Sequence, residues 1–270
     1  GDDAIYGDQG DDDIAGGSHD DVIVGGAGND TIRGDTGNDI LWGGFEDVSP
    51  TVLDLGTADN FQRPIGFDEA EAALVAAGLA GSGFTPPRIT PVAVNGLSLT
   101  GLSTDGSDRI EGGAGIDFIF GGGDADFLFG GADSDYIDGG VASDEVWGDA
   151  GDDIVRGGAN SDVVHGGTGI DMRYGDTGDD YLFGDAGRKG DAGIGGDTSA
   201  APNSQSGQRL FGGDGIDYLY AYADVTVNAS AGALAAEVVL RGDELHGDAG
   251  GDWLFGNLRA DLMFGDGGND

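Results

Sequence analysis

Carboxylates that could bind a cation recur every nine residues in this chain. Eight nine-residue units run without a gap from Gly112 to Phe183, and the sixth residue of each unit is aspartate. Glycine recurs at the first, second and fourth positions, as in the unit GGAGNDTIR that begins at Gly25. Glycine permits the positive backbone angles of a tight turn and leaves carbonyl oxygens uncovered, and the aspartate adds a hard anionic oxygen beside them. These oxygen ligands suit Ca²⁺.

The last three residues of each unit must position these turns. They alternate outward, inward and outward in a short strand, so only the eighth residue, aliphatic in most units, points into the interior. Two units make one coil, and residues eighteen apart stack on one edge, where two turns face each other across a cation. Without metal, carboxylates about 4.8 Å apart would repel one another. We therefore expect folding to require calcium, with roughly one ion for each stacked pair of turns.

The repeat G-G-x-G-x-D-x-U-x, in which U is a large aliphatic residue, resembles that of the RTX family of secreted bacterial proteins. The resemblance implies a calcium-loaded parallel β-roll that folds outside the cell, at the cell surface or beyond it, after type I secretion. Gly1 takes a fourth position of the repeat and Asp270 a sixth. We therefore expect the chain to be a piece of a longer polypeptide whose export signal lies elsewhere.

The repeat predicts an all-β fold, a single continuous β-roll over residues 1–270 with about nineteen short strands. Three insertions, at 45–104, 188–206 and 223–241, enter where a turn should be. The first precedes the sixth strand, whereas the second and third precede the fifteenth and seventeenth. Because successive turns lie on alternate edges, we expect the first insertion to emerge opposite the other two.

The first insertion has the pattern of a small subdomain. A capping-box-like start at Asp68 predicts a helix over 70–80, and Asn95-Gly96 between two apolar triplets predicts a hairpin. This subdomain would be either a pad over an apolar patch of the roll or a knob that binds a partner. The second insertion reads as a surface loop, and the third could form another hairpin.

The sixth-position aspartates are the predicted calcium ligands, and they divide between two edges. One edge, called the Asp144 edge below, carries Asp12, Asp30, Asp108, Asp126, Asp144, Asp162, Asp180, Asp217, Asp252 and Asp270. The other, called the Asp153 edge, carries Asp21, Asp39, Asp117, Asp135, Asp153, Asp171, Asp243 and Asp261, and its ladder also includes Asp3.

The Asp153 edge has one irregular place. Gln208 stands where aspartate is expected, and Arg173 takes an inward position that is aliphatic elsewhere. One interpretation is local decay of the repeat: Met172 turns inward through a bulge, and Arg173 reaches solvent or a carboxylate of the second insertion. The other is a deliberate polar site at that edge.

Composition excludes several classes of function. The chain has 51 acidic and 11 basic residues and a formal charge of −40, which is incompatible with binding nucleic acid through its phosphates. It has no cysteine and no apolar run long enough to cross a membrane. No H-E-x-x-H or G-x-S-x-G motif occurs, and a glycosidase pair chosen from so many carboxylates would be arbitrary, so we expect no enzyme activity.

Aromatic residues recur at outward positions and should form columns. One column would contain Phe129, Trp147, His165, Phe183, Tyr220 and Phe255. A neighbouring column includes Phe127, Val163, Tyr181, Tyr218 and Trp253, and the opposite sheet offers Trp42, Phe118, Phe120, Tyr136, Tyr174, Phe211 and Phe264. Such columns could simply stabilise a parallel stack, or they could be covered by another copy of the chain or another extracellular protein. A carbohydrate platform is a weaker alternative.

Two functions remain open. In the first, the chain is a calcium-binding structural and assembly module of a large secreted bacterial surface or matrix protein, such as an adhesin or surface-layer protein. In the second, it is the calcium-triggered folding and export module of a secreted enzyme or toxin whose active domain lies outside the chain. The three insertions and the aromatic faces favour the first.

Overall fold

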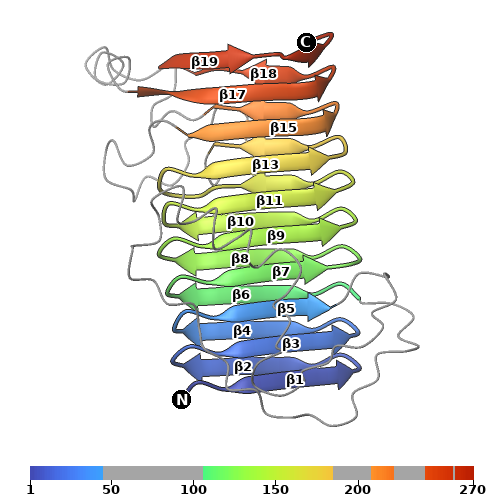
Figure 1. The fold of residues 1–270 in the computed structure, drawn as a ribbon, viewed down its shortest axis with the longest axis vertical. Coiled ribbons are helices and arrows are strands. Elements are labelled where there is room, and N and C mark those ends of the chain that lie inside the picture. The colour runs from blue at the N-terminus through green and yellow to red at the C-terminus, as the bar shows by residue number, and fades with distance from the viewer. Residues whose placement is uncertain (45–105, 185–207, 222–240, 258) are drawn as a thin grey trace, which may run out of the picture.

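A computed structural model describes residues 1–44, 106–184, 208–221, 241–257 and 259–270. The elements in these residues are all strands, and all of their pairings are parallel. Successive strands along the chain belong in turn to two different sheets, so the chain passes from one sheet to the other at the turns between them. Figure 1 shows the resulting roll, with coils stacked in order from the N-terminus to the C-terminus. The predicted all-β parallel roll is confirmed.

Two sheets make up the roll. The larger contains β1 (Ala4–Gln9), β3 (Val22–Ala27), β5 (Ile40–Gly44), β7 (Phe118–Gly122), β9 (Tyr136–Val141), β11 (Ile154–Ala159), β13 (Met172–Thr177), β15 (Arg209–Gly215), β17 (Arg241–Gly250), β19 (Ala260–Phe264) and β20 (Gly267–Gly268). The smaller contains β2 (Asp13–Ser18), β4 (Thr31–Thr36), β6 (Arg109–Ala114), β8 (Phe127–Ala132), β10 (Glu145–Ala150), β12 (Val163–His165), β14 (Tyr181–Phe183), β16 (Tyr218–Tyr220) and β18 (Trp253–Phe255).

The interior of the roll holds a single file of side chains, one from each of β1 to β19, which are apolar except for Arg173 in β13. Met263, in the last coil, is 50% exposed although an inward place was predicted for it. In β10, Val146 is fully buried and pairs in register with Leu128 on one side and Val164 on the other. Each of β1 to β19 contributes one of the nineteen predicted inward residues, and β20 is a two-residue addition that pairs with β17. Because each strand supplies only one core residue, the stability of a coil depends on the coils next to it.

Glycine serves two different purposes in the turns. At the second and fourth positions the backbone has positive φ, as at Gly26 (120°) and Gly28 (131°), so the sequence-based explanation holds there. At the first position φ is not positive, and glycine is needed because there is no room for a side chain. A Cβ on Gly130 would lie 2.5 Å from both the Asp135 Oδ2 and the Gly148 carbonyl oxygen.

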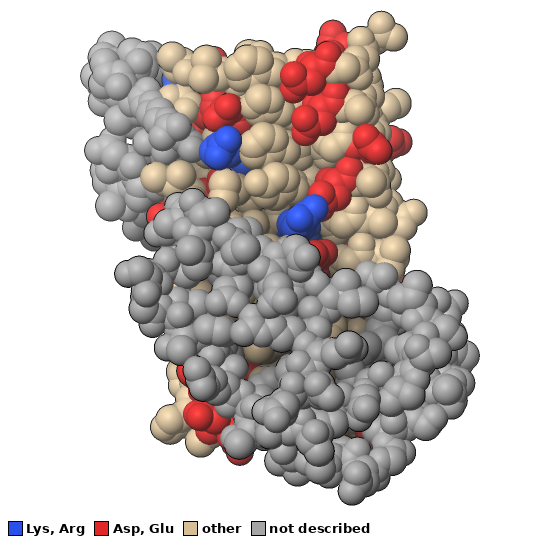
Figure 2. Space-filling model, in the orientation of Figure 1, with Lys and Arg blue, Asp and Glu red and all other residues tan. Residues whose placement is uncertain are grey.

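One outward row of the larger sheet is nearly as buried as the core. Phe118 is fully buried, and Tyr136 and Ile154 are each 2% exposed, although their side chains point away from the interior of the roll. Figure 2 shows rows of acidic side chains, and fewer basic ones, on one face of the roll. Within the described residues we find no helix that is long and apolar enough to span a membrane.

The three predicted insertions, with their helix and hairpins, lie outside the described residues. The strands that flank them fix where the chain leaves the roll. At the first insertion the chain passes from β5 in the larger sheet to β6 in the smaller one. At the second and third it passes from the smaller sheet to the larger one, from β14 to β15 and from β16 to β17. The first departure point is therefore on the opposite edge of the roll from the other two.

Candidate calcium sites

The sixth-position aspartates form two continuous ladders along the edges of the roll. In each ladder the backbone N–H of one aspartate donates to Oδ1 of the aspartate on the next coil, as from Asp126 to Asp144 and from Asp144 to Asp162, both at 2.8 Å. The Asp144 edge extends in this way from Asp12 to Asp270. The Asp153 edge extends from Asp3 to Asp261 and passes through Gln208. All eighteen predicted ligands stand in these two ladders.

The second carboxylate oxygen is the chemically unusual one. Oδ2 is buried and has no hydrogen-bond partner within the described residues in Asp12, Asp21, Asp30, Asp39, Asp117, Asp135, Asp144, Asp153, Asp162, Asp180, Asp217 and Asp252. A buried, unsatisfied carboxylate oxygen is costly, and proteins rarely leave one without a proton or a cation. Its repetition along both edges indicates a ligand that the protein atoms alone do not supply.

The surroundings of Oδ2 fit a hard cation. The space beside Gly130 is bounded by Asp135 Oδ2 from the same turn and by the Gly148 carbonyl oxygen from the next coil. The same pair of oxygens recurs beside Gly112, where Asp117 Oδ2 and the Gly130 carbonyl oxygen converge. Carboxylate and backbone carbonyl oxygens are the ligands that Ca²⁺ prefers. The described residues contain no cluster of three or more acidic or histidine side chains that could hold a metal, so glycine carbonyls would have to complete each site.

Burial makes these carboxylates hard to ionise without a cation. Desolvation raises the pKa of Asp144 to about 7, and desolvation followed by nearby carboxylates raises the pKa of Asp162 and Asp180 to about 8. The pKa values of Asp135 and Asp153, deeper in the Asp153 edge, are raised well above the usual range for the same reasons. A bound cation would supply the positive charge that keeps these groups ionised at neutral pH.

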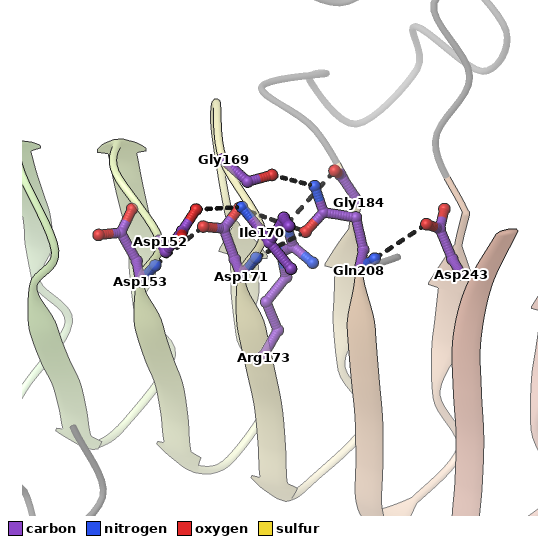
Figure 3. A network of polar contacts seen from close by, with 9 residues as sticks. All are labelled: Asp152, Asp153, Gly169, Ile170, Asp171, Arg173, Gly184, Gln208 and Asp243. Atoms are coloured by element: carbon purple, nitrogen blue, oxygen red, sulfur yellow. Dashed lines mark hydrogen bonds and ion pairs between the residues drawn. The ribbon is translucent and has the colours of Figure 1, made fainter. Parts of the chain in front are cut away.

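Arg173 departs from the pattern in an unexpected way (Figure 3). The register of β13 with β11 and β15 has no shift, and Arg173 pairs with Val155 and Leu210 in the core file. The predicted bulge and the predicted exit of Arg173 to solvent are therefore wrong, since the side chain is fully buried. Its Nη2 donates to Asp171 Oδ2 at 2.7 Å and to Gln208 Oε1 at 3.0 Å.

The last coils differ from the middle of the roll. The Asn257 backbone N–H donates to Asp261 Oδ2 at 2.7 Å, and the Asn257 side-chain amide lies 3.4 Å from Asp243 Oδ2. Asp270 is exposed. The carboxylates of Asp243 and Asp261 thus already have protein partners, which distinguishes them from the buried Oδ2 atoms of the middle coils.

Sequence reasoning missed a second ladder, formed at the fifth position of the turn. The backbone N–H of Asn38 donates to Asp20 Oδ1 at 3.0 Å, and that of Ile116 donates to Asn38 Oδ1 at 2.9 Å. Here each side chain accepts from the following coil, whereas a sixth-position aspartate accepts from the preceding one. The sequence signal that could have predicted this second ladder is the frequent occurrence of Asp, Asn and Ser at the fifth position. These bonds bind the turns together without using the sixth-position Oδ2.

The predicted column of rings is present. Phe129, Trp147, His165, Phe183, Tyr220 and Phe255 stack with centroid separations of 4.6–5.1 Å and nearly parallel planes. On the larger sheet, Tyr174, Phe211, His246 and Phe264 stack at 4.6–5.1 Å. Histidine therefore serves as a ring in both columns.

Comparison with known proteins gives the chain a family. No curated protein and no solved structure matches it. The family model of the RTX calcium-binding nonapeptide repeat matches residues 1–18, 15–47, 102–137, 138–172, 174–188, 206–225 and 241–270, which together make up more than half of the chain. These repeats bind calcium and are typical of secreted proteins. The chain therefore belongs to the RTX calcium-binding nonapeptide repeat family.

Proposed function

We propose that this chain is a calcium-folded structural and assembly module of a large secreted bacterial surface or matrix protein, without catalytic activity of its own. The observation that carries the proposal is the row of buried, unsatisfied Oδ2 atoms along both edges of the roll. A fold that leaves so many carboxylate oxygens unsatisfied requires a ligand beside them. The family's calcium chemistry provides that ligand.

In the proposed sites the two carboxylate oxygens of each aspartate have different roles. Oδ1 is held by a backbone N–H of the preceding coil, which fixes the carboxylate and aims Oδ2 at the space beside the first-position glycine. Calcium supplies positive charge between coils when it binds there. Oδ2 and a glycine carbonyl oxygen would hold the ion, and the missing glycine side chain leaves the space open.

The aromatic columns support an assembly role. Phe127 is 47% exposed and Trp253 is 56% exposed. The predicted neighbouring column, which takes the seventh residue of each repeat in the smaller sheet, therefore presents apolar rings to solvent. Exposed rings on a rigid face are typical of surfaces that bind another protein. We propose that this column packs against another copy of the chain or another extracellular protein. A carbohydrate is the weaker candidate.

Circular dichroism in calcium and in chelator tests the folding half of the proposal. Millimolar calcium should produce a β spectrum, and excess chelator at pH 7.5 should abolish it, because buried carboxylates would then ionise without a counter-charge. A fully folded spectrum in chelator at that pH would contradict the proposal. If calcium folds the chain but it stays monomeric and binds no partner, the export-module alternative is favoured.

A further inference from the structure

One turn of the Asp153 edge already contains a cation. Arg173 Nη2 donates to Asp171 Oδ2 at 2.7 Å and to the Gly184 carbonyl oxygen at 3.3 Å. Asp171 Oδ2 and the Gly184 carbonyl are the counterparts, at this coil, of Asp135 Oδ2 and the Gly148 carbonyl, which converge beside Gly130. A Cβ on Gly166 would collide with the guanidinium group. The arginine nitrogen therefore occupies the space that is bounded by two oxygens at the other coils.

Gln208 completes this arrangement without a charge. Its Oε1 accepts the backbone N–H of Asp171 at 2.8 Å, as the aspartate Oδ1 does elsewhere in the ladder. Its Nε2 donates to the Gly169 carbonyl oxygen at 2.7 Å. A second carboxylate here would leave a net negative charge beside the guanidinium, whereas the amide gives one positive and one negative group. Arg173, Asp171 and Gln208 are all fully buried, so this balance matters.

Asp171 differs from the aspartate on the preceding coil of its ladder, because its Oδ2 has a protein partner. Asp153, one coil before it, has a buried Oδ2 with no hydrogen-bond partner among the described residues, whereas Asp171 Oδ2 is paired with Arg173. The arginine is not perfectly accommodated, because its Nε and Nη1 find no partner within the described part of the chain. An aliphatic residue would fill the core file better, as Val155 and Leu210 do on either side. The presence of arginine at this position is thus explained by the contacts of its guanidinium at the edge of the roll and not by packing in the core.

We propose that Arg173 replaces a calcium ion at the junction between the Asp171 and Gln208 coils, so that this one junction is built without metal. The proposal rests on the proposed function, in which the other junctions hold calcium. It removes Asp171 from the predicted calcium ligands. It also places a metal-free joint where the chain leaves the roll between Gly184 and Gln208 for the second insertion.

Restoring the repeat at this junction tests the proposal. Arg173→Leu with Gln208→Asp recreates an aliphatic core residue and a second carboxylate, so the full chain should bind at least one more calcium ion than the wild type. Equilibrium dialysis with atomic emission spectrometry measures the ions per chain. The converse pair, Val146→Arg with Asp162→Gln, moves the arrangement to the Asp144 edge and should remove at least one ion.

The possible results separate the two proposals. Equal stoichiometry in the wild type and a folded Arg173→Leu/Gln208→Asp variant would overturn the arginine proposal alone. If that variant does not fold, an anomalous difference map from wild-type crystals grown in calcium decides the matter: an empty Asp171–Gln208 junction supports the proposal, and an ion there refutes it. A wild-type chain that binds no calcium would overturn the proposed function and this inference with it.

Discussion

At the scale of the residue, two opposing effects set the pKa of Asp144. The backbone N–H of the preceding coil favours the ionised form, and burial disfavours it by a larger amount, so that the pKa of Asp144 rises to about 7. Calcium and the proton are then competitors for the same Oδ2. Metal-free and calcium-loaded rolls should respond to pH in opposite senses.

We expect acid to stabilise the metal-free roll. The pKa of Asp144 is about 7 in the fold and near 3.8 in an unfolded chain, so the folded state holds more protons between these values. Its contribution to stability is complete below pH 4 and is lost as the pH rises through 7. Circular dichroism in chelator should therefore show more β structure at pH 4.5 than at pH 8.

The calcium titration should run the other way, because ion binding displaces protons. The calcium midpoint of folding should fall as the pH rises from 6 to 8, and binding should release protons in an unbuffered titration. Asp144→Asn keeps the side-chain size but removes the titrating group, and it should weaken both effects. A calcium midpoint that is independent of pH would show that these carboxylates are ionised before the metal binds.

At the scale of the element, the turn decides whether a coil can form. The turn from Gly139 to Asp144 illustrates both requirements. Gly140 has a φ of 103° at the second position, whereas Ala142 has a φ of 92° at the fourth, a conformation that an L-residue adopts only at a cost. Gly139 needs no unusual φ, but its missing side chain leaves room for Asp144 Oδ2 and the Gly157 carbonyl oxygen.

Substitutions in this turn should have opposite effects on stability. Ala142→Gly should raise the free energy of unfolding in calcium by about 1 kcal/mol, because it removes the strained left-handed alanine. Gly139→Ala should lower it by about 1–3 kcal/mol and raise the calcium midpoint, because the methyl group enters the proposed ion space. Denaturant unfolding in saturating calcium measures the first value. A Gly139→Ala variant with wild-type calcium affinity would place the ion elsewhere in the turn.

The sequence predicted the strands and ladders well because both depend on a strict period. Every inward residue from Ile5 to Met263 lies in its own strand. Arg173 could not be placed in the same way, because its position violates the rule that inward residues are apolar, and only the partners contributed by Asp171, Gly184 and Gln208 make its burial tolerable. The fifth-position ladder was missed because its members vary among Asp, Asn and Ser, all of which are also common in ordinary turns.

At the scale of the whole molecule, the two sheets of the roll present unlike outer faces. The outward row around Phe118 is buried, whereas Phe127 and Trp253 on the smaller sheet are largely exposed. An assembly surface should therefore be sought on the smaller sheet. Calcium would control it indirectly, because the column exists only when the coils are stacked.

We expect Phe127→Ser with Trp253→Ser to weaken self-association while leaving calcium-induced folding intact, because neither ring fills the core. Sedimentation velocity over a range of concentrations in calcium measures the association. The matched control is Ile170→Ser with Ile216→Ser, which removes apolar side chains that are 42% and 46% exposed but lie outside the ring columns. Equal association in the wild type and both variants would refute assembly through this column.

The alternation of strands between the two sheets fixes the edge of the roll on which each departure point lies. Nine strands, β6 to β14, separate the first departure from the roll and the second, and two strands, β15 and β16, separate the second and third. An odd count puts two departures on opposite edges, and an even count puts them on the same edge. Loss of eighteen residues would shorten the roll and change nothing else. Loss of nine within β6 to β14 would preserve the repeat but bring all three departures onto one edge.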